Sequence, residues 1–315
     1  MRELLFFTIG LLIASSTVQA GSSAIEISAT YAVIPDVTYL KADGVELKLD
    51  IYTPKVNVGT QDPDLAKVSG NPRTVPTLVF FHGGGWVAGT KEQQNLRLLP
   101  YLNKGWAVVN VEYRLGSVAL APAAVEDTRC ATWWVKRNAE KYGFDPDRIV
   151  LSGGSAGGHL ALITGMLTAD AGLDRRCPGF REKPRGAAEF PELKVAAIVN
   201  WFGITDVNDL IKGPNMKTYA AAWMGAQENR ESIAKRVSPL SYIHKNLPPI
   251  LTLHGDKDEV VPYSHAVRLH KRLDKNGTPN QLHTVKGAGH GSFSVAETIA
   301  AFNVIDTFLA KHVDE

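Results

Sequence analysis

From residue 77 onward, short apolar runs alternate with segments whose apolar residues recur at helical spacing. A run of roughly four to eight apolar residues bounded by turn residues is typical of a strand buried on both faces. Such runs occupy residues 77–81, 107–111, 148–151, 195–201, 249–253 and 281–285. Helical spacing occurs at residues 93–103, 123–142, 158–169, 264–276 and 296–312. This order predicts an α/β fold in which helices cover both faces of a mostly parallel central sheet.

The segment before these runs has a different pattern. Residues 37–54 alternate apolar and polar side chains on either side of Asp43-Gly44, a dipeptide that favours a two-residue turn between antiparallel strands. We therefore expect an N-terminal antiparallel hairpin. Residues 55–75 are polar and contain Pro, Gly and Asn, which is typical of an exposed connection.

Two further stretches interrupt the alternation. Residues 170–192 are rich in charge, Gly and Pro, and residues 203–247 hold several weak helical patterns. Ligands bind at the carboxyl ends of the strands in an open parallel sheet, where long loops shape the pocket. We expect both stretches to be insertions at this end of a single domain that spans residues 21–315.

Residues 1–20 have the three-part layout of a secretory signal peptide, with Arg2, an apolar run at 4–14 and small residues ending at Ala20. The apolar run is shorter than the ~20 residues that span a bilayer. We expect cleavage near Ala20 and export to the periplasm or the medium. No stable membrane insertion is expected after cleavage.

The overall charge argues against nucleic acid as a partner. Lys and Arg number 34 against 32 Asp and Glu, and no dense basic cluster is interleaved with aromatic residues. A small, neutral substrate fits this composition better.

An oxidising compartment would permit a disulfide between Cys130 and Cys177. The pairing stays open, because the sequence does not show whether their Cα atoms approach within ~7 Å, and the oligomeric state stays open too.

Gly153-Gly154-Ser155-Ala156-Gly157 lies between a predicted strand and a predicted helix. In this context the pattern is typical of a nucleophile elbow, a strained turn that exposes a serine hydroxyl. Glycine at the flanking positions lacks the Cβ that would collide with neighbouring chain. A phosphate-binding turn is the alternative. However, the Lys-Ser/Thr of a P-loop and the spacing of a dinucleotide fingerprint are both missing.

His82-Gly83-Gly84-Gly85-Trp86 directly follows the apolar run at 77–81. Glycines let a backbone approach a ligand closely with its N–H groups pointed inward. The amides of Gly84, Gly85 and Ala156 are therefore candidate donors to the oxyanion of a tetrahedral intermediate, each worth about 2.7–4 kcal/mol. We expect His82 to organise this loop and not to act as a base.

A serine nucleophile needs a general base that is held by a carboxylate. When a serine elbow of this kind is catalytic, the chain order is Ser, acid, His. His290 is the expected base, because it lies in the glycine-rich loop 287–291 just past the last predicted strand. His265, His270 and His312 occupy helical positions, which favours structural roles.

Asp256 and Asp258 both follow the apolar run at 249–253. Asp258 is the expected acid because it lies farther into the loop, whereas Asp256 is expected to brace the turn. Asp206 is an outside alternative.

The Asp256-x-Asp258 spacing resembles the start of a calcium loop, but Val261 stands where the sixth-position glycine belongs. We therefore predict no metal site, and no cofactor.

Taken in this order, these motifs resemble those of the α/β-hydrolase carboxylesterases. The resemblance is to bacterial feruloyl-esterase-like and acetyl-esterase-like enzymes and to the hormone-sensitive-lipase group, over about residues 37–312. It implies an α/β-hydrolase fold, a catalytic triad and an oxyanion hole at the positions named above. The chain departs from the hormone-sensitive-lipase branch at residues 21–75, which are too strand-rich and polar for a helical cap. We therefore expect a shallow, open pocket.

The leading hypothesis is an exported carboxylic-ester hydrolase with Ser155, Asp258 and His290 as its triad. Its expected substrates are short-chain acyl, acetyl or feruloyl esters of small molecules or plant cell-wall carbohydrates. A serine peptidase of the prolyl-oligopeptidase type is the enzymatic alternative, although the three-glycine loop favours an esterase. A non-catalytic binding module on the same fold is the remaining alternative, and it would be expected to lose a triad residue.

Overall fold

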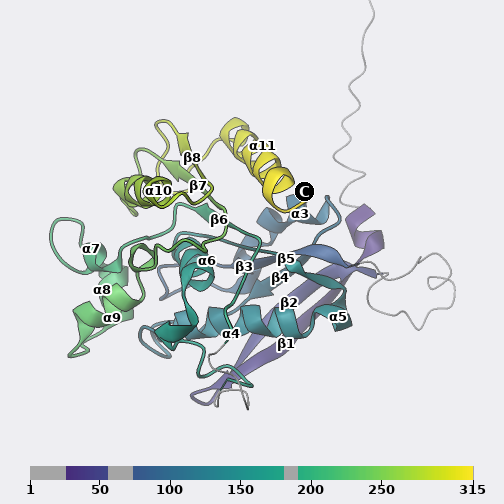
Figure 1. Ribbon diagram of the computed structural model, residues 1–315, viewed down its shortest axis with the longest axis horizontal. Helices are drawn as coiled ribbons and strands as arrows, with labels where there is room; N and C mark the ends of the chain where they lie inside the picture. The colour runs from purple at the N-terminus through teal and green to yellow at the C-terminus, as the bar shows by residue number, and fades with distance from the viewer. Residues whose placement is uncertain (1–25, 56–73, 181–190, 315) are drawn as a thin grey trace, which may run out of the picture.

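The computed structural model describes residues 26–55, 74–180 and 191–314, so the expected signal peptide and most of the connection at 55–75 lie outside the described residues. The chain forms an eight-stranded sheet in the order β1-β2-β4-β3-β5-β6-β7-β8 (Figure 1). The pairs β3–β4, β3–β5, β5–β6, β6–β7 and β7–β8 are parallel, whereas β1–β2 and β2–β4 are antiparallel. The strands are β1 (Tyr31–Ala42), β2 (Val45–Pro54), β3 (Val75–Phe81), β4 (Ala107–Val111), β5 (Phe144–Gly154), β6 (Ala197–Trp201), β7 (Ile250–Gly255) and β8 (Asn280–Val285).

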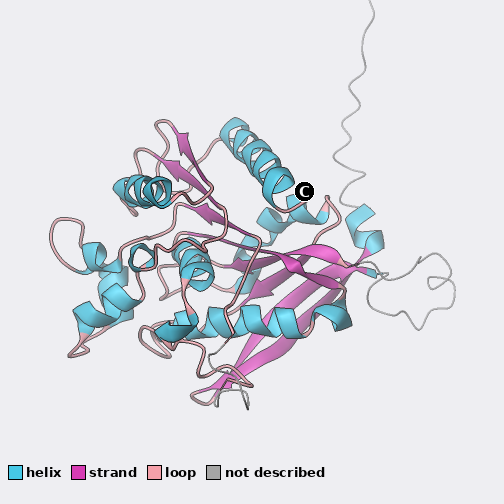
Figure 2. Cartoon of the chain, in the orientation of Figure 1, coloured by secondary structure: helices cyan, strands magenta, loops and turns pink. Residues whose placement is uncertain are grey.

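Helices cover both faces of this sheet, as the alternating pattern predicts (Figure 2). They are α3 (Leu99–Leu102), α4 (Ala123–Arg137), α5 (Ala139–Tyr142), α6 (Ala156–Met166), α7 (Val207–Ile211), α8 (Thr218–Met224), α9 (Arg230–Arg236), α10 (Ser264–Asn276) and α11 (Val295–His312). Short 3₁₀ helices occupy Lys91–Leu98, Ala169–Ala171 and Pro239–Ser241. Within the described residues, no helix combines the length and apolarity needed to cross a bilayer.

The core lies in two layers, one on each face of the sheet. In β3, Val79 and Phe81 join the cluster that packs on α4, α6 and α10, while Leu78 and Phe80 join the cluster under α3 and α11. Side chains alternate between the faces of a strand, so a strand covered on both sides must be apolar throughout. The expectation of two-sided burial is wrong for β8, in which only Val285 is buried, because this strand lies at the edge of the sheet.

The predicted N-terminal hairpin is present. Asp43 and Gly44 both have positive φ, at 49° and 79°, and Ala42 pairs with Val45 across them. Positive φ at both central residues gives the turn a twist that matches the two strands. The hairpin is longer than predicted, because β1 begins at Tyr31.

Some element boundaries differ from the sequence-based prediction. The expected helix at 93–103 is a 3₁₀ helix followed by α3, with a break at Gln94 (φ −122°, ψ 19°). The stretch 123–142 contains two helices that meet at Asn138. Strand β5 runs through Gly154, and α6 begins at Ala156. Glycine and alanine contribute little to an apolar pattern, so the carboxyl end of β5 and the start of α6 were not visible in it.

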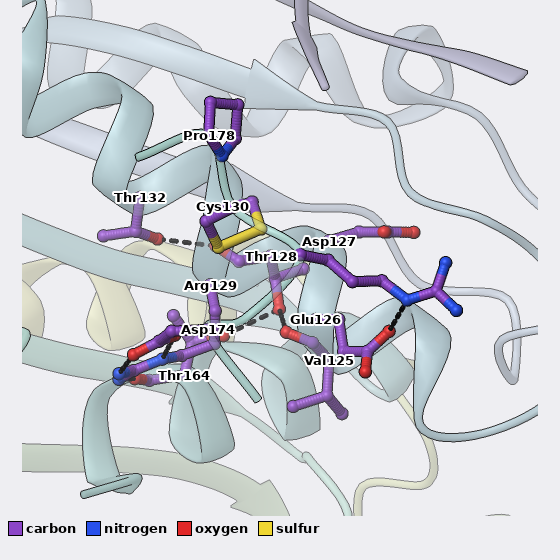
Figure 3. Close-up of a disulfide and its surroundings, with 12 residues drawn as sticks. Val125, Glu126, Asp127, Thr128, Arg129, Cys130, Thr132, Thr164, Asp174 and Pro178 are labelled. Carbon is purple, nitrogen blue, oxygen red and sulfur yellow. Dashed lines mark hydrogen bonds and ion pairs between the residues drawn. A yellow bond between two sulfur atoms is a disulfide. The ribbon is translucent and has the colours of Figure 1, made fainter. Parts of the chain in front are cut away.

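A disulfide joins Cys130 of α4 to Cys177, with a Cα–Cα distance of 4.9 Å (Figure 3). This answers the question that the sequence left open. Beside it, Arg129 Nε donates to Asp174 Oδ1 at 2.6 Å. The two contacts hold the segment around residues 174–177 against the side of α4.

Candidate active site

Ser155 stands at the sharp turn between β5 and α6, with φ 58° and ψ −120°. Positive φ is uncommon for a residue with a side chain, and the surrounding chain enforces it. The Ser155 amide donates to the Trp201 carbonyl at 2.9 Å. A Cβ on Gly157 would lie 2.0 Å from the Phe81 carbonyl oxygen, and one on Gly153 would lie 2.5 Å from that oxygen. Glycine at both positions therefore lets the turn pack against the end of β3.

The glycine loop after β3 lies beside this turn. Gly84 and Gly85 have φ of 114° and 60°, and a Cβ on Gly84 would lie 1.9 Å from the Ala88 carbonyl oxygen. Both glycines line the same cavity as Ser155. Ala156 is the first residue of α6, where amide groups have no partner within the helix. The structure thus brings the candidate oxyanion donors close to the candidate nucleophile.

His82 is buried beneath this loop. Its Nδ1 donates to the Gly83 carbonyl at 2.8 Å, and its ring stacks on Tyr113 with centroids 4.2 Å apart. The Tyr113 hydroxyl in turn donates to the His82 carbonyl at 2.9 Å. These contacts fix the loop in place, which is the organising role expected for His82.

His290, after β8, meets Asp258, after β7. His290 Nδ1 donates to Asp258 Oδ2 at 2.7 Å, and Asp258 Oδ1 accepts the amides of Val260 and Val261 at 2.9 and 2.8 Å. Burial alone would raise the pKa of Asp258, but hydrogen bonds from His254 and His290 hold that pKa well below its usual range. The carboxylate is therefore charged at neutral pH. It fixes the His290 tautomer in which Nε2 accepts a proton.

His254, at the end of β7, was missed by sequence reasoning. Its buried Nε2 lies 3.2 Å from Asp258 Oδ2 and 3.0 Å from the Val261 carbonyl oxygen. Within the described chain, its Nδ1 is buried without a hydrogen-bond partner. The available signal was its place at the carboxyl end of a buried strand, four residues before the candidate acid.

The other candidate acids have different partners. Asp256 Oδ1 accepts the Gly287 amide at 2.6 Å, so this residue ties the acid loop to the histidine loop. Asp206 forms an ion pair with Arg268 at 2.8 Å. In the part of the chain that the structure covers, no three His, Cys, Asp or Glu side chains gather as a metal site would require.

The cavity in front of Ser155 has a volume of about 480 Å³. Its apolar side includes Phe202, which meets the His290 ring edge-on at 4.7 Å, and Tyr219 of α8, whose hydroxyl donates to the Val260 carbonyl at 3.1 Å. Tyr219 belongs to the predicted insertion 203–247. The lining residues are Gly83, Gly84, Gly85, Gln94, Arg97, Gly154, Ser155, Phe202, Tyr219, Val260, His290 and Gly291.

A second cavity of about 560 Å³ lies between β1 and the segment around Arg176, and it contains none of the candidate residues. The polar groups that converge beside Ser155 therefore distinguish the first cavity as the candidate active site.

This fold and this site define the chain as an α/β-hydrolase. A BD-FAE family model matches residues 64–273, and a phospholipase/carboxylesterase model matches residues 234–313. The chain belongs to the BD-FAE family.

Several known proteins similar to the chain are named esterases. Esterase LipQ of Mycobacterium tuberculosis is 30% identical over 244 residues, which cover 75% of this chain and 54% of that protein. The chain spans about half the length of the curated relatives that it matches.

Two solved structures resemble nearly the whole chain. One is a truncated carbohydrate esterase from gut microbiota (TM-score 0.67, 27% identity, 89% of this chain and 96% of the other). Another is a thermophilic esterase of Thermogutta terrifontis with bound butyrate (TM-score 0.67, 27% identity, 91% and 95%).

Proposed function

We propose that the protein is a carboxylic-ester hydrolase that acts through Ser155, His290 and Asp258. One observation carries this proposal. The 2.7 Å hydrogen bond from His290 to the buried Asp258 orients an imidazole in the cavity that Ser155 also lines. The esterase names of the similar proteins support the same reaction.

In the proposed reaction, His290 Nε2 takes the proton of Ser155 Oγ as this oxygen attacks the ester carbonyl carbon. The amides of Gly84, Gly85 and Ala156 donate to the resulting oxyanion. His290 then gives its proton to the leaving alkoxide, and an acyl-enzyme remains. Water deprotonated by His290 attacks this acyl group, and Ser155 recovers its proton as the acid departs.

The cavity supports small acyl groups as substrates. Phe202, Tyr219 and Val260 offer an apolar wall suited to a short chain or a single aromatic ring. A longer alkyl chain would extend into water and gain none of the ~0.8 kcal/mol per buried CH₂. The butyrate bound in the similar Thermogutta terrifontis esterase supports this size. We propose short-chain acyl, acetyl or feruloyl esters, including those on plant cell-wall carbohydrates.

Ser155→Ala tests the nucleophile. The variant should lose ester hydrolysis and covalent labelling by a fluorophosphonate, with an unchanged circular dichroism spectrum because only a cavity hydroxyl is removed. Labelling that survives the substitution would show that another residue is the nucleophile.

A panel of p-nitrophenyl esters, with methyl ferulate and acetylated xylan, tests the substrate class. A preference for decanoate over butyrate would contradict the small-acyl proposal.

Export after cleavage near Ala20 is a second part of the proposal, based on residues 1–20. Expression in a bacterial host followed by N-terminal sequencing of the periplasmic and medium fractions tests it. A mature chain that begins near Gly21 is expected. An intact Met1 on protein confined to the cytoplasm would contradict export.

A further inference from the structure

Arg97 and Gln94 reach the candidate active site from one short helix. Arg97 lies in the last turn of the 3₁₀ helix Lys91–Leu98, and its Nη1 lies 3.5 Å from where a Cβ on Gly154 would stand. The helix is interrupted at Gln94, whose Nε2 lies 3.4 Å from where a Cβ on Gly83 would stand. One side chain therefore adjoins the serine elbow, and the other adjoins the glycine loop.

Among the described residues, Arg97 differs from Arg114 and Arg129 in lacking a counter-ion. Arg114 pairs with Asp127 at 2.6 Å, and the Arg129 guanidinium is bound by Asp174. Within residues 26–55, 74–180 and 191–314, no carboxylate lies within ion-pair distance of Arg97, and none lines the cavity. Burial lowers the pKa of the Arg97 guanidinium, which reflects the cost of an unpaired, half-buried charge.

Aromatic rings hold this guanidinium in place. Its central carbon lies 5.6 Å from the centroid of the Trp201 ring and 5.8 Å from that of Phe202. Phe202 also contacts the His290 ring. A guanidinium that lies over rings keeps its N–H donors free for a planar anion. The charge is thus presented beside the reacting groups.

We infer that Arg97 and Gln94 form a carboxylate-binding subsite, and that the preferred esters carry a carboxylate close to the ester bond. The guanidinium would donate two parallel N–H bonds to this carboxylate, and the Gln94 amide would add a third donor. This inference rests on the proposed ester hydrolysis and narrows its substrate class. The carboxylate could belong to the acyl group, as in a monoester of a dicarboxylic acid, or to the alcohol, as in an acylated hydroxy acid or uronic acid.

Paired substrates distinguish the two sources. For the acyl side, kcat/KM for p-nitrophenyl monoadipate is divided by that for the neutral amide of the same ester. For the alcohol side, 4-acetoxybenzoate is compared with 4-acetoxybenzamide. The wild-type protein should prefer the charged member of at least one pair by about tenfold or more, the range of a charge-assisted hydrogen bond.

Arg97→Met tests the residue, because methionine keeps an apolar stem over the rings and removes the charge. This substitution should bring the charged-to-neutral ratio to about one, and Arg97→Lys should restore part of the preference. Arg137→Met is the matched control. Arg137 also lies over a ring, 5.8 Å from the centroid of Phe180, but it does not line the cavity. This variant should keep the wild-type ratio.

A wild-type protein without a charge preference in either pair would overturn the inference. So would an Arg97→Met variant that loses activity equally on charged and neutral esters, because that is the result expected of a purely structural cation–ring contact. Hydrolysis of the neutral esters would leave the proposed function standing in both cases.

If no ester is hydrolysed, the proposed function fails, and binding decides the inference. Calorimetric titration of the Ser155→Ala protein with adipate and with 4-hydroxybenzoate should detect binding of at least one of them. Adding Arg97→Met should weaken this binding about tenfold or more. Equal affinity with and without Arg97, or no binding of either acid, would overturn the subsite.

Discussion

At the scale of single residues, Asp258 has the most densely bonded side chain of the candidate site. Two backbone amides donate to its Oδ1, and the imidazoles of His254 and His290 approach its Oδ2. A buried carboxylate keeps its charge only when such donors replace the water that it has lost. The same donors hold the carboxylate in one orientation, and this in turn sets the orientation of His290.

Asp258→Asn should lower kcat on p-nitrophenyl acetate by up to about 10⁴-fold, because an amide no longer fixes the catalytic tautomer or stabilises the imidazolium. Asp256→Asn is the matched control. It should cost far less, since Asp256 accepts only the Gly287 amide within the hydrogen bonds of the described residues. Equal kcat values for the two variants would show that Asp258 is not the acid.

His254 is expected to act on the reaction through Asp258. His254→Phe keeps a flat ring and removes the donor, so kcat should fall about tenfold while KM changes little. His254→Gln, which retains an N–H donor, should recover part of kcat. His270→Phe is the control, because His270 is also buried but bonds to Asn280. Similar kcat losses in His254→Phe and His270→Phe would indicate a general packing effect.

At the scale of elements, α4 anchors the segment around residues 174–177, which forms no helix or strand. The Cys130–Cys177 disulfide and the Arg129–Asp174 pair join residues distant in sequence to one side of this helix (Figure 3). Neither cysteine lines the candidate active site. We therefore expect this attachment to stabilise the fold and to have little effect on catalysis.

Removal of the disulfide in a Cys130→Ala, Cys177→Ser double variant should lower the free energy of unfolding by about 2–4 kcal/mol, because the unfolded chain gains freedom. Activity at 25 °C should stay near the wild-type level. Urea unfolding with and without dithiothreitol measures the effect, and the reduced wild-type protein should match the variant. A reductant that leaves the wild-type unfolding midpoint unchanged would contradict this role.

The apolar pattern of the sequence predicted most elements but not all of their ends. Strands β3 to β7 and the hairpin were predicted because burial on both faces of a strand, or on one, imposes its own pattern on the sequence. Strand β8 was predicted from the same apolar pattern, although only Val285 in it is buried. The carboxyl end of β5 and the start of α6 were misplaced, because Gly153, Gly154 and Ala156 carry no large side chain. The break at Gln94 was missed as well, because the apolar spacing of residues 93–103 carries no sign of it.

At the scale of the whole molecule, buried histidines make stability depend on pH. Burial lowers the pKa of His159 to about 4 and that of His265 to about 4. An unfolded histidine has a pKa near ~6.5, so the unfolded state binds more protons between about pH 4 and pH 6.5. Stability should therefore be level above this window and fall as the pH drops through it.

Urea unfolding between pH 7 and pH 4.5 should show a loss of about 5 kcal/mol in the free energy of unfolding, roughly half from each histidine. His159→Gln should remove about half of this dependence, because glutamine does not titrate but can still accept from Trp86 Nε1 and donate to the Val237 carbonyl, as His159 does. A free energy of unfolding that is constant across this range would mean that the two histidines are not buried in the neutral form.

The sequence by itself determined the type of fold and the order of the candidate catalytic groups. Strand burial, the Asp43-Gly44 turn and the glycines around Ser155 are each imposed by neighbours along the chain or by steric limits on one residue, so they leave a local signature. The tertiary structure alone decided which distant side chains share the cavity. Arg97, Phe202 and Tyr219 line it from separate elements. His254 meets Asp258 away from the cavity, and the Cys130–Cys177 disulfide joins two other segments. Periodicity reports that a side chain faces inward, but not which partner it meets there. An unpaired charge such as that of Arg97 can be recognised only when its neighbours in space are known.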